Sequence, residues 1–181
     1  MGDGRTITME TGVLAKQADG AVTVRLGDTI LLATIVSTKE ARDTQVVISM
    51  MSSDKKNPGD SLACLAASAC IAVSDVPFDG PVSEVRVARV DGKFIINPMV
   101  ADIERADIEM VVAGTATDIM MVEGEMKEVQ EVDMIEAIKL AHEAIKDQCR
   151  VIKELGEAVA KSHVKRTYSH ENANPELEKK I

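Results

Sequence analysis

The most constraining feature of this 181-residue sequence is one long amphipathic stretch that follows Asp133. Apolar residues recur there at every third or fourth position, at Met134, Ile138, Ala141, Ile145, Cys149, Ile152, Leu155 and Val159. This spacing predicts a single helix whose one apolar stripe faces the core. Asp133 and Glu136 have the spacing of a capping box, which predicts where the helix begins.

Most of the chain before this helix consists of β-prone segments separated by turn signals. We expect strands over residues 6–12, 21–26, 30–36, 45–51, 82–90, 93–96, 108–114 and 119–122. Asp91-Gly92 is typical of a type I′ hairpin turn, and Asp19-Gly20 is a second turn signal. The apolar runs 30–36 and 45–51 predict buried strands, the first of them buried on both faces.

A second helix is expected after Gly59, with Asp60 or Ser61 as its cap. Its many small residues predict close packing against a sheet. Cys64 and Cys70 lie on this helix, and they fit two small buried side chains better than a metal or redox site. A short helix is expected over residues 100–106.

The composition argues against several classes of protein. Aromatic residues make up 2% of the chain, so the core is aliphatic and an aromatic surface that stacks bases is not expected. The formal net charge of −9 argues against a large nucleic-acid footprint. No long charge-free apolar run and no N-terminal signal core occur, so we expect a cytoplasmic chain without a membrane span. Three cysteines do not suggest a disulfide framework.

Familiar catalytic motifs are mostly missing. The sequence has neither a phosphate-binding P-loop nor a dinucleotide-binding glycine motif. His142-Glu143 begins like a zinc-protease helix, but Lys146 stands where the second histidine ligand is needed. The acidic residues at 102–109 and 123–131 are interpreted as a solvated surface.

A series of motifs, in their order along the chain, resembles the polynucleotide phosphorylase family. They are Leu26-Gly27-Asp28-Thr29, Leu32-Ala33-Thr34, the segment 80–87, the segment 119–124, Glu128, the segment 134–138 with Ala141 and His142, and Tyr168-Ser169-His170-Glu171. The chain is similar to the first of the two ribonuclease PH-like domains of that family. The resemblance implies an α+β fold, ribonuclease PH-like (ribosomal S5 domain 2-like), with mixed sheets and packed helices. It assigns residues 1–162 to this domain and 163–181 to a linker towards a helical domain.

The resemblance also implies a function. Members of the family, polyribonucleotide nucleotidyltransferases, degrade RNA from the 3′ end with phosphate and release nucleoside diphosphates. Their subunits form a homotrimeric ring around an RNA channel. The second ribonuclease PH-like domain carries the chemistry and uses Mg²⁺, so the partners implied for this chain are that catalytic domain, further subunits and RNA.

Two departures from the active copy point to a non-catalytic domain. The active copy binds phosphate with consecutive serines at a helix start, where this chain has Pro58-Gly59-Asp60, a residue without an N–H and a carboxylate that repels an anion. The active copy holds the metal with an Asp…Asp-x-Lys set, and Ile103, Glu109 and Val111 align there. One carboxylate cannot hold the ion and balance the transition state. We therefore expect no catalytic, phosphate-binding or metal residue and no cofactor on this chain, and the sequence identifies no RNA-binding residue.

A third departure lies between Arg42 and Asp43. The family has a long additional segment there, which includes core elements and a basic, Phe-containing loop that grips RNA. This chain passes directly across, so its absence would remove core elements and the main RNA contact, in keeping with the net charge.

Two alternatives remain open. An active ribonuclease PH-type enzyme would hold Mg²⁺ with Glu109 together with Asp102 or Asp107. A subunit-interaction module would pack against other domains without contacting RNA.

Overall fold

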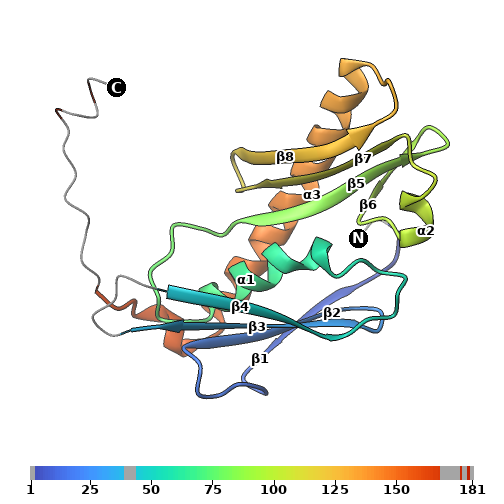
Figure 1. Cartoon of the computed structure of the whole chain (residues 1–181). Coiled ribbons are helices and arrows are strands. Elements are labelled where there is room, and N and C mark those ends of the chain that lie inside the picture. Colours follow the sequence, from blue (N-terminus) through green and yellow to red (C-terminus); the bar gives the residue numbers. More distant parts are fainter. Residues whose placement is uncertain (1–2, 39–43, 168–175, 177–178, 180–181) are drawn as a thin grey trace.

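Two four-stranded sheets, connected by one long helix, make up most of the computed structural model (Figure 1). The structure describes residues 3–38, 44–167, 176 and 179. The first sheet has the order β1-β2-β3-β4 and the second the order β6-β5-β7-β8. The strands are β1 (Ile7–Thr11), β2 (Gly20–Leu26), β3 (Thr29–Ser37), β4 (Thr44–Ser52), β5 (Ser83–Val90), β6 (Lys93–Ile96), β7 (Ile108–Gly114) and β8 (Ile119–Met126). The helical segments are η1 (Asp60–Leu62), α1 (Ala63–Ala72), α2 (Val100–Ile103), α3 (Glu131–Glu157) and η2 (Ala160–His163).

The predicted α+β fold is confirmed, with one difference in strand pairing. Every strand pair among the described residues is antiparallel, so neither sheet is mixed as expected. Each strand pairs with a neighbour reached by a turn or a short crossing, and such connections favour antiparallel pairing. Tyr168-Ser169-His170-Glu171 and the junction after Arg42 lie outside the described residues.

The first sheet buries only one of its faces. Alternate residues of β2 and β3 pack under α1, whereas the intervening residues of β3 are half-buried or exposed. The prediction that residues 30–36 are buried on both faces is therefore wrong. The prediction of a buried strand over 45–51 is also wrong, because β4 is an edge strand and eight of its nine residues are exposed.

Small residues allow α1 to lie close to the first sheet. Ala66 and Ala69 are completely buried against it. The prediction that Gly20 belongs to a hairpin turn is wrong, because Gly20 is the first residue of β2. A Cβ added to Gly20 would lie 2.4 Å from the Cys70 carbonyl oxygen. The turn lies earlier, where Ala18 N donates to Ala15 O.

The second sheet begins with the predicted hairpin. Asp91 and Gly92 between β5 and β6 both have positive φ, as a type I′ turn requires. One face of β5 and β7 is covered by the first half of α3, where Ala137, Ala141 and Ile145 are completely buried.

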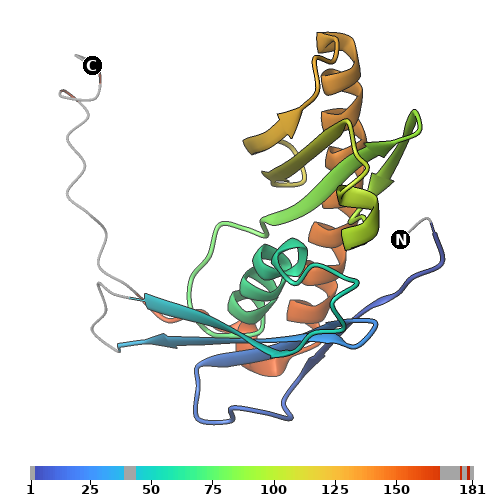
Figure 2. The ribbon, with the colours of Figure 1, turned by 45° about the vertical axis from the view of Figure 1, so that its right-hand side comes forward.

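Helix α3 packs against both sheets, as the two views in Figures 1 and 2 show. Its apolar stripe is as predicted, and Ile152 near its end belongs to the core of the first sheet. The predicted capping box is wrong: the helix begins at Glu131, and the Asp133 carboxylate instead forms an ion pair with Arg89 at 2.9 Å.

The segment after α3 returns to the first sheet. Arg166 donates to Asp19 and Asp75 at 2.8 and 2.5 Å, and its N–H donates to the Asp75 carbonyl. Lys161 donates to the Asp19 carbonyl at 2.6 Å. These contacts connect the start of β2, the end of α1 and the segment that follows α3. The domain boundary at residue 162 stays a prediction.

Candidate functional site

Arg86 lies at the centre of a polar cluster on the face of the second sheet that α3 does not cover. Its guanidinium donates to Asp60 Oδ2 at 2.5 Å through Nη2, and to Glu109 Oε1 through Nη1. The side chain is 17% exposed, so the two carboxylates neutralise a largely buried charge. We call Asp60, Arg86 and Glu109 the arginine cluster.

The strand register puts these side chains on one face. Arg86 of β5 is paired with Val111 of β7, and Glu109 lies two residues before Val111 on the same side of the pleat. Met110, between them, points to the opposite face and is buried against α3. The buried Asn97 accepts from the Arg86 N–H through Oδ1 at 2.9 Å and so fixes the backbone of β5.

The loop before η1 is held by Asp54. Its carboxylate accepts from the N–H groups of Lys56 and Asn57, from the Asn57 side chain and from the Thr29 hydroxyl. These hydrogen bonds, led by the Asn57 N–H, hold the pKa of Asp54 well below its usual range. Val100 N donates to Lys56 O at 3.0 Å and brings α2 to the same loop.

The start of the helical segment departs from the predicted cap. Neither Asp60 nor Ser61 caps η1 or α1, because the Ser61 hydroxyl donates back to the Pro58 carbonyl at 2.8 Å. Asp60 Oδ1 accepts from Ser61 N at 2.8 Å, while Oδ2 accepts from Arg86. The Asp60 carboxylate therefore accepts hydrogen bonds from both the Ser61 N–H and the Arg86 guanidinium, the two groups here that would otherwise attract an anion.

The residues aligned with the metal ligands do not fit Mg²⁺. Ile103 and Val111 have no ligand atoms, and Glu109 is paired with Arg86. The half-buried Glu84, also on β5, has its pKa raised by burial. Within the described ranges, no group of three or more His, Cys, Asp or Glu side chains is placed to hold a metal ion.

The carboxylates of the alternative metal site are engaged elsewhere. Asp107 accepts two hydrogen bonds from Arg89 at 2.9 Å, and Asp102 accepts from Met99 N at 3.3 Å. Each of the three carboxylates thus has a different partner: Arg86 for Glu109, Arg89 for Asp107 and the Met99 N–H for Asp102.

Two cysteine and two histidine side chains outside the arginine cluster are buried, half-buried or bonded to backbone carbonyl groups. Burial raises the pKa of the Cys64 thiol to about 11 and that of Cys70 to about 12, so both are protonated at neutral pH. His142 Nε2 lies 3.1 Å from Thr115 O, and His163 Nε2 lies 2.8 Å from Glu157 O. His170 lies outside the described residues.

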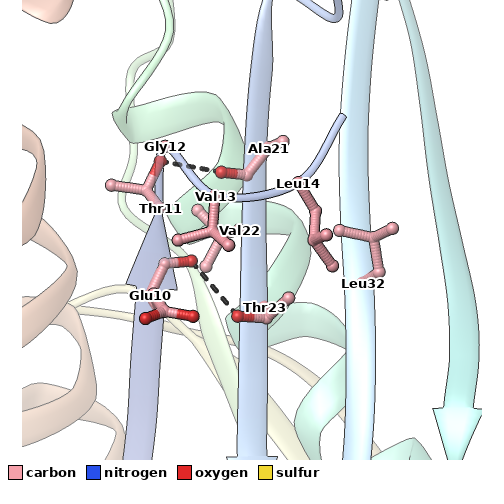
Figure 3. A pocket seen from close by; sticks show the side chains of 9 residues that line it. All are labelled: Glu10, Thr11, Gly12, Val13, Leu14, Ala21, Val22, Thr23 and Leu32. Atoms are coloured by element: carbon pink, nitrogen blue, oxygen red, sulfur yellow. Dashed lines mark hydrogen bonds between the residues drawn. The ribbon is translucent and has the colours of Figure 1, made fainter. Parts of the chain in front are cut away.

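A shallow hollow lies on the outer face of the first sheet (Figure 3). It is lined by Glu10, Thr11, Gly12, Val13, Leu14, Ala21, Val22, Thr23 and Leu32. The Thr11 hydroxyl donates to Ala21 O and the Thr23 hydroxyl to Glu10 O, so both hydroxyls are engaged within the sheet. Glu10 is its one ionisable residue, which leaves no set of groups for catalysis.

Sequence reasoning missed the role of Arg86. The residue belongs to the quoted segment 80–87, yet its charge was given no partner. The available signal was alternation: Glu84 and Arg86 share a face of β5 that a buried strand would fill with apolar residues.

Across the described part of the chain, no helix is both long enough and apolar enough to span a bilayer.

Two family models match this chain. Residues 3–45 match domain 1 of the 3′ exoribonuclease family, and residues 80–144 match domain 2 of the same family. Together these matches cover more than half of the sequence. The chain belongs to the 3′ exoribonuclease family. Domain 1 corresponds to β1–β3, and domain 2 corresponds to the second sheet with the first half of α3.

Relatives with the name polyribonucleotide nucleotidyltransferase match the whole chain. The protein of Parabacteroides distasonis is 46% identical and that of Porphyromonas gingivalis 44% identical, each over 239 aligned positions. The chain is covered completely, but it spans only 32% of the length of either relative. Because 239 aligned positions face a chain of 181 residues, at least 58 positions have no counterpart here.

The structure of rice (Oryza sativa) Rrp46 has the same fold. The match has a TM-score of 0.68 and covers 85% of this chain and all of the rice chain. The sequence identity is 14%, so this likeness concerns the fold alone.

Proposed function

We propose that this chain is the first, non-catalytic ribonuclease PH-like domain of a polyribonucleotide nucleotidyltransferase. The whole enzyme would degrade RNA from the 3′ end with phosphate and release nucleoside diphosphates. The names of the relatives support the enzyme class, and the order of the motifs supports the first domain. In this proposal the domain builds the subunit and shapes the RNA entrance, while a second copy carries the reaction.

The arginine cluster is the observation that carries the non-catalytic part of the proposal. Phosphorolysis needs an anion site for phosphate and a cation to neutralise the developing charge. Here the Asp60 carboxylate takes the place of the anion, and the Arg86 guanidinium takes the charge of Glu109. Because these charged groups pair with one another, binding of phosphate or Mg²⁺ at this place would require breaking an existing ion pair.

The surroundings of the domain are also part of the proposal. Mg²⁺ would bind on the catalytic copy and not on this chain. RNA, the second ribonuclease PH-like domain and two further subunits of a trimer would be its partners, in the cytoplasm, and residues 163–181 would lead to a helical domain. The net charge of −9 agrees with an RNA contact carried by other parts of the enzyme.

A phosphorolysis assay tests this proposal. The purified chain is incubated with a homopolymeric RNA, phosphate and Mg²⁺, with the full-length Parabacteroides distasonis relative as the positive control. We expect no nucleoside diphosphate from the chain. Robust release that is lost in a Glu109→Ala variant would contradict the proposal and support an active ribonuclease PH-type enzyme.

Filter binding separates an RNA-contacting domain from a pure subunit-interaction module. Residual RNA contact predicts an affinity that falls as the salt concentration rises. Absence of binding at low salt would favour the interaction module.

A further inference from the structure

Helix α3 covers only part of the second sheet. The completely buried strand residues beneath it come from β5 and β7, and in the described part of the chain β8 contributes none. Val122 of β8 is paired with Val112 of β7, yet Val122 is 41% exposed and Val112 is completely buried. A helix is about 10 Å wide and strands lie about 4.8 Å apart, so one helix covers about two strands. The middle of the edge strand β8 is therefore open beside α3 (Figures 1 and 2).

One side of α3 borders this open part of β8. His142 Nε2 lies 3.1 Å from Thr115 O, in the connection between β7 and β8, so this side of the helix faces β8. Ile135 lies two helical turns before His142, and Val132 lies one turn before Ile135, so both are directed towards the same side. Ile135 is 48% exposed and Val132 is 63% exposed. We call Val122, Val132 and Ile135 the β8–α3 surface.

The part of the chain that forms this surface is strongly acidic. Residues 118–136 contain seven acidic side chains and one lysine, a net charge of −6 against −9 for the whole chain. Asp133 is paired with Arg89. No ion pair within the described ranges involves the five exposed glutamates Glu123, Glu125, Glu128, Glu131 and Glu136. Exposed apolar residues with a charged rim are typical of a protein-binding surface.

We infer that the β8–α3 surface binds a basic amphipathic helix of a partner protein. The apolar side of that helix would contact Val122, Val132 and Ile135, and its lysine or arginine residues would lie beside the glutamates. It would pack next to α3, with about 8–10 Å between the two axes, and would extend the helical layer over β8. The positive charge matters because an acidic or uncharged helix would bring carboxylates together or leave them without a partner.

Charge disfavours the other occupants of this surface. RNA is an anion and would meet the most acidic part of the chain here. A second copy of the chain has the same net charge of −9. A further strand at the edge of β8 would bury Glu123 and Glu125, which alternate with uncharged residues along that strand. A basic helix avoids all three conflicts.

The test is peptide binding measured by fluorescence anisotropy. The probe is a labelled peptide of leucine and lysine with its leucines on one helical side, and its control has glutamate in place of lysine. Wild type is expected to bind only the lysine peptide, with an affinity that falls as salt rises. A Val122→Gln, Ile135→Gln double variant should raise the dissociation constant at least about tenfold. The matched control is Val36→Gln, Val47→Gln in the first sheet, where these residues are 55% and 45% exposed, and it should leave the constant unchanged.

Methyl NMR spectra of wild type keep the inference testable if a variant folds poorly. The lysine peptide should shift the methyl signals of Val122 and Ile135 and leave those of Val36 and Val47 in place. Four results would each overturn the inference: no binding, equal binding of the glutamate peptide, an unchanged constant in the Val122, Ile135 variant, or an equal loss in the control variant. None of these measurements involves RNA, phosphate or Mg²⁺, so the proposed function is tested separately.

Discussion

The two sheets have the same number of strands and a helix on one face, yet their outer edges are built differently. One edge strand of the second sheet is β8, where Glu123 and Glu125 alternate with uncharged residues. One edge strand of the first sheet is β4, which has exposed apolar residues and no charged side chain. Charged side chains on an edge strand disfavour pairing with a further strand, because an approaching strand would bury them. The edge strand β4 of the first sheet lacks this protection.

The largest effect is expected in the shared core. Ile145 packs under the second sheet and Ile152 under the first, and both are completely buried. Truncation of either to alanine should reduce the free energy of unfolding by about 2–5 kcal/mol. Because both residues lie on α3, a single urea transition is expected in each variant. Two separate transitions would break the comparison, since the sheets would then be independent units.

A second pair of variants compares close backbone contacts in the two sheets. An added Cβ at Gly20 would lie 2.4 Å from the Cys70 carbonyl oxygen, and at Gly124 it would lie 2.3 Å from the Glu109 carbonyl oxygen. Gly20→Ala should destabilise by about 1–3 kcal/mol, because β2 is trapped between its neighbours and α1. Gly124→Ala should cost less, because the edge strand β8 can move outward. Equal losses in chemical denaturation would show that β8 is as constrained as β2.

The pH dependence of the unfolding free energy compares two arginine–carboxylate pairs, here called the clamps: Arg166 with Asp75, and Arg89 with Asp107. The Arg166 hydrogen bond lowers the pKa of Asp75 beside the first sheet, and the Arg89 hydrogen bond lowers the pKa of Asp107 beside the second. Both carboxyls therefore ionise in the folded chain at a lower pH than in the unfolded chain. Their contribution to stability is complete above the unfolded pKa and is lost as the pH falls through the folded pKa.

Arg166→Gln and Arg89→Gln should therefore each weaken the acid dependence of the unfolding free energy. The expected loss at neutral pH is about 1 kcal/mol or less per ion pair, as for partly exposed pairs. Urea titrations at neutral and acidic pH measure it. Arg105→Gln is the control, because its pair with Asp91 is largely exposed. An acid dependence that persists unchanged in both clamp variants would contradict this assignment.

The smallest effect on folding is expected from removing the charges of β8. Glu123 and Glu125 are exposed, so a Glu123→Val, Glu125→Val double variant should change the unfolding free energy by only about 0.5 kcal/mol. The same change should make β8 resemble β4, and light scattering should then detect association through the second sheet. A double variant that associates no more than wild type would show that charge is not what separates the two edges.

Local sequence signals predicted most of the elements. The Asp91-Gly92 hairpin and the apolar stripe of α3 were correct, because both depend on residues close together in the chain. The errors arose where distant residues decide. Asp60 and Asp133 have the chemistry of helix caps, but Arg86 and Arg89, on β5, take their carboxylates instead.

The exposure of β4 could not be predicted for a related reason. An apolar run indicates a strand, but its burial depends on which neighbours are present. The candidate site shows the same limit. Pro58, Asp60, Ile103 and Val111 could be recognised as unsuitable for phosphate or metal from their side chains alone. That Arg86 joins Asp60 to Glu109 depends on the register of β5 and β7, which no local pattern specifies.

The position of α3 has a consequence for how the chain is made. Synthesis runs from the N-terminus, so β1 to β4 leave the ribosome long before Ile152 and Arg166, which complete their packing. The nascent first sheet therefore has α1 but neither the end of α3 nor the arginine that ties Asp19 to Asp75. During that interval the apolar residues that Ile152 later covers are still open to solvent.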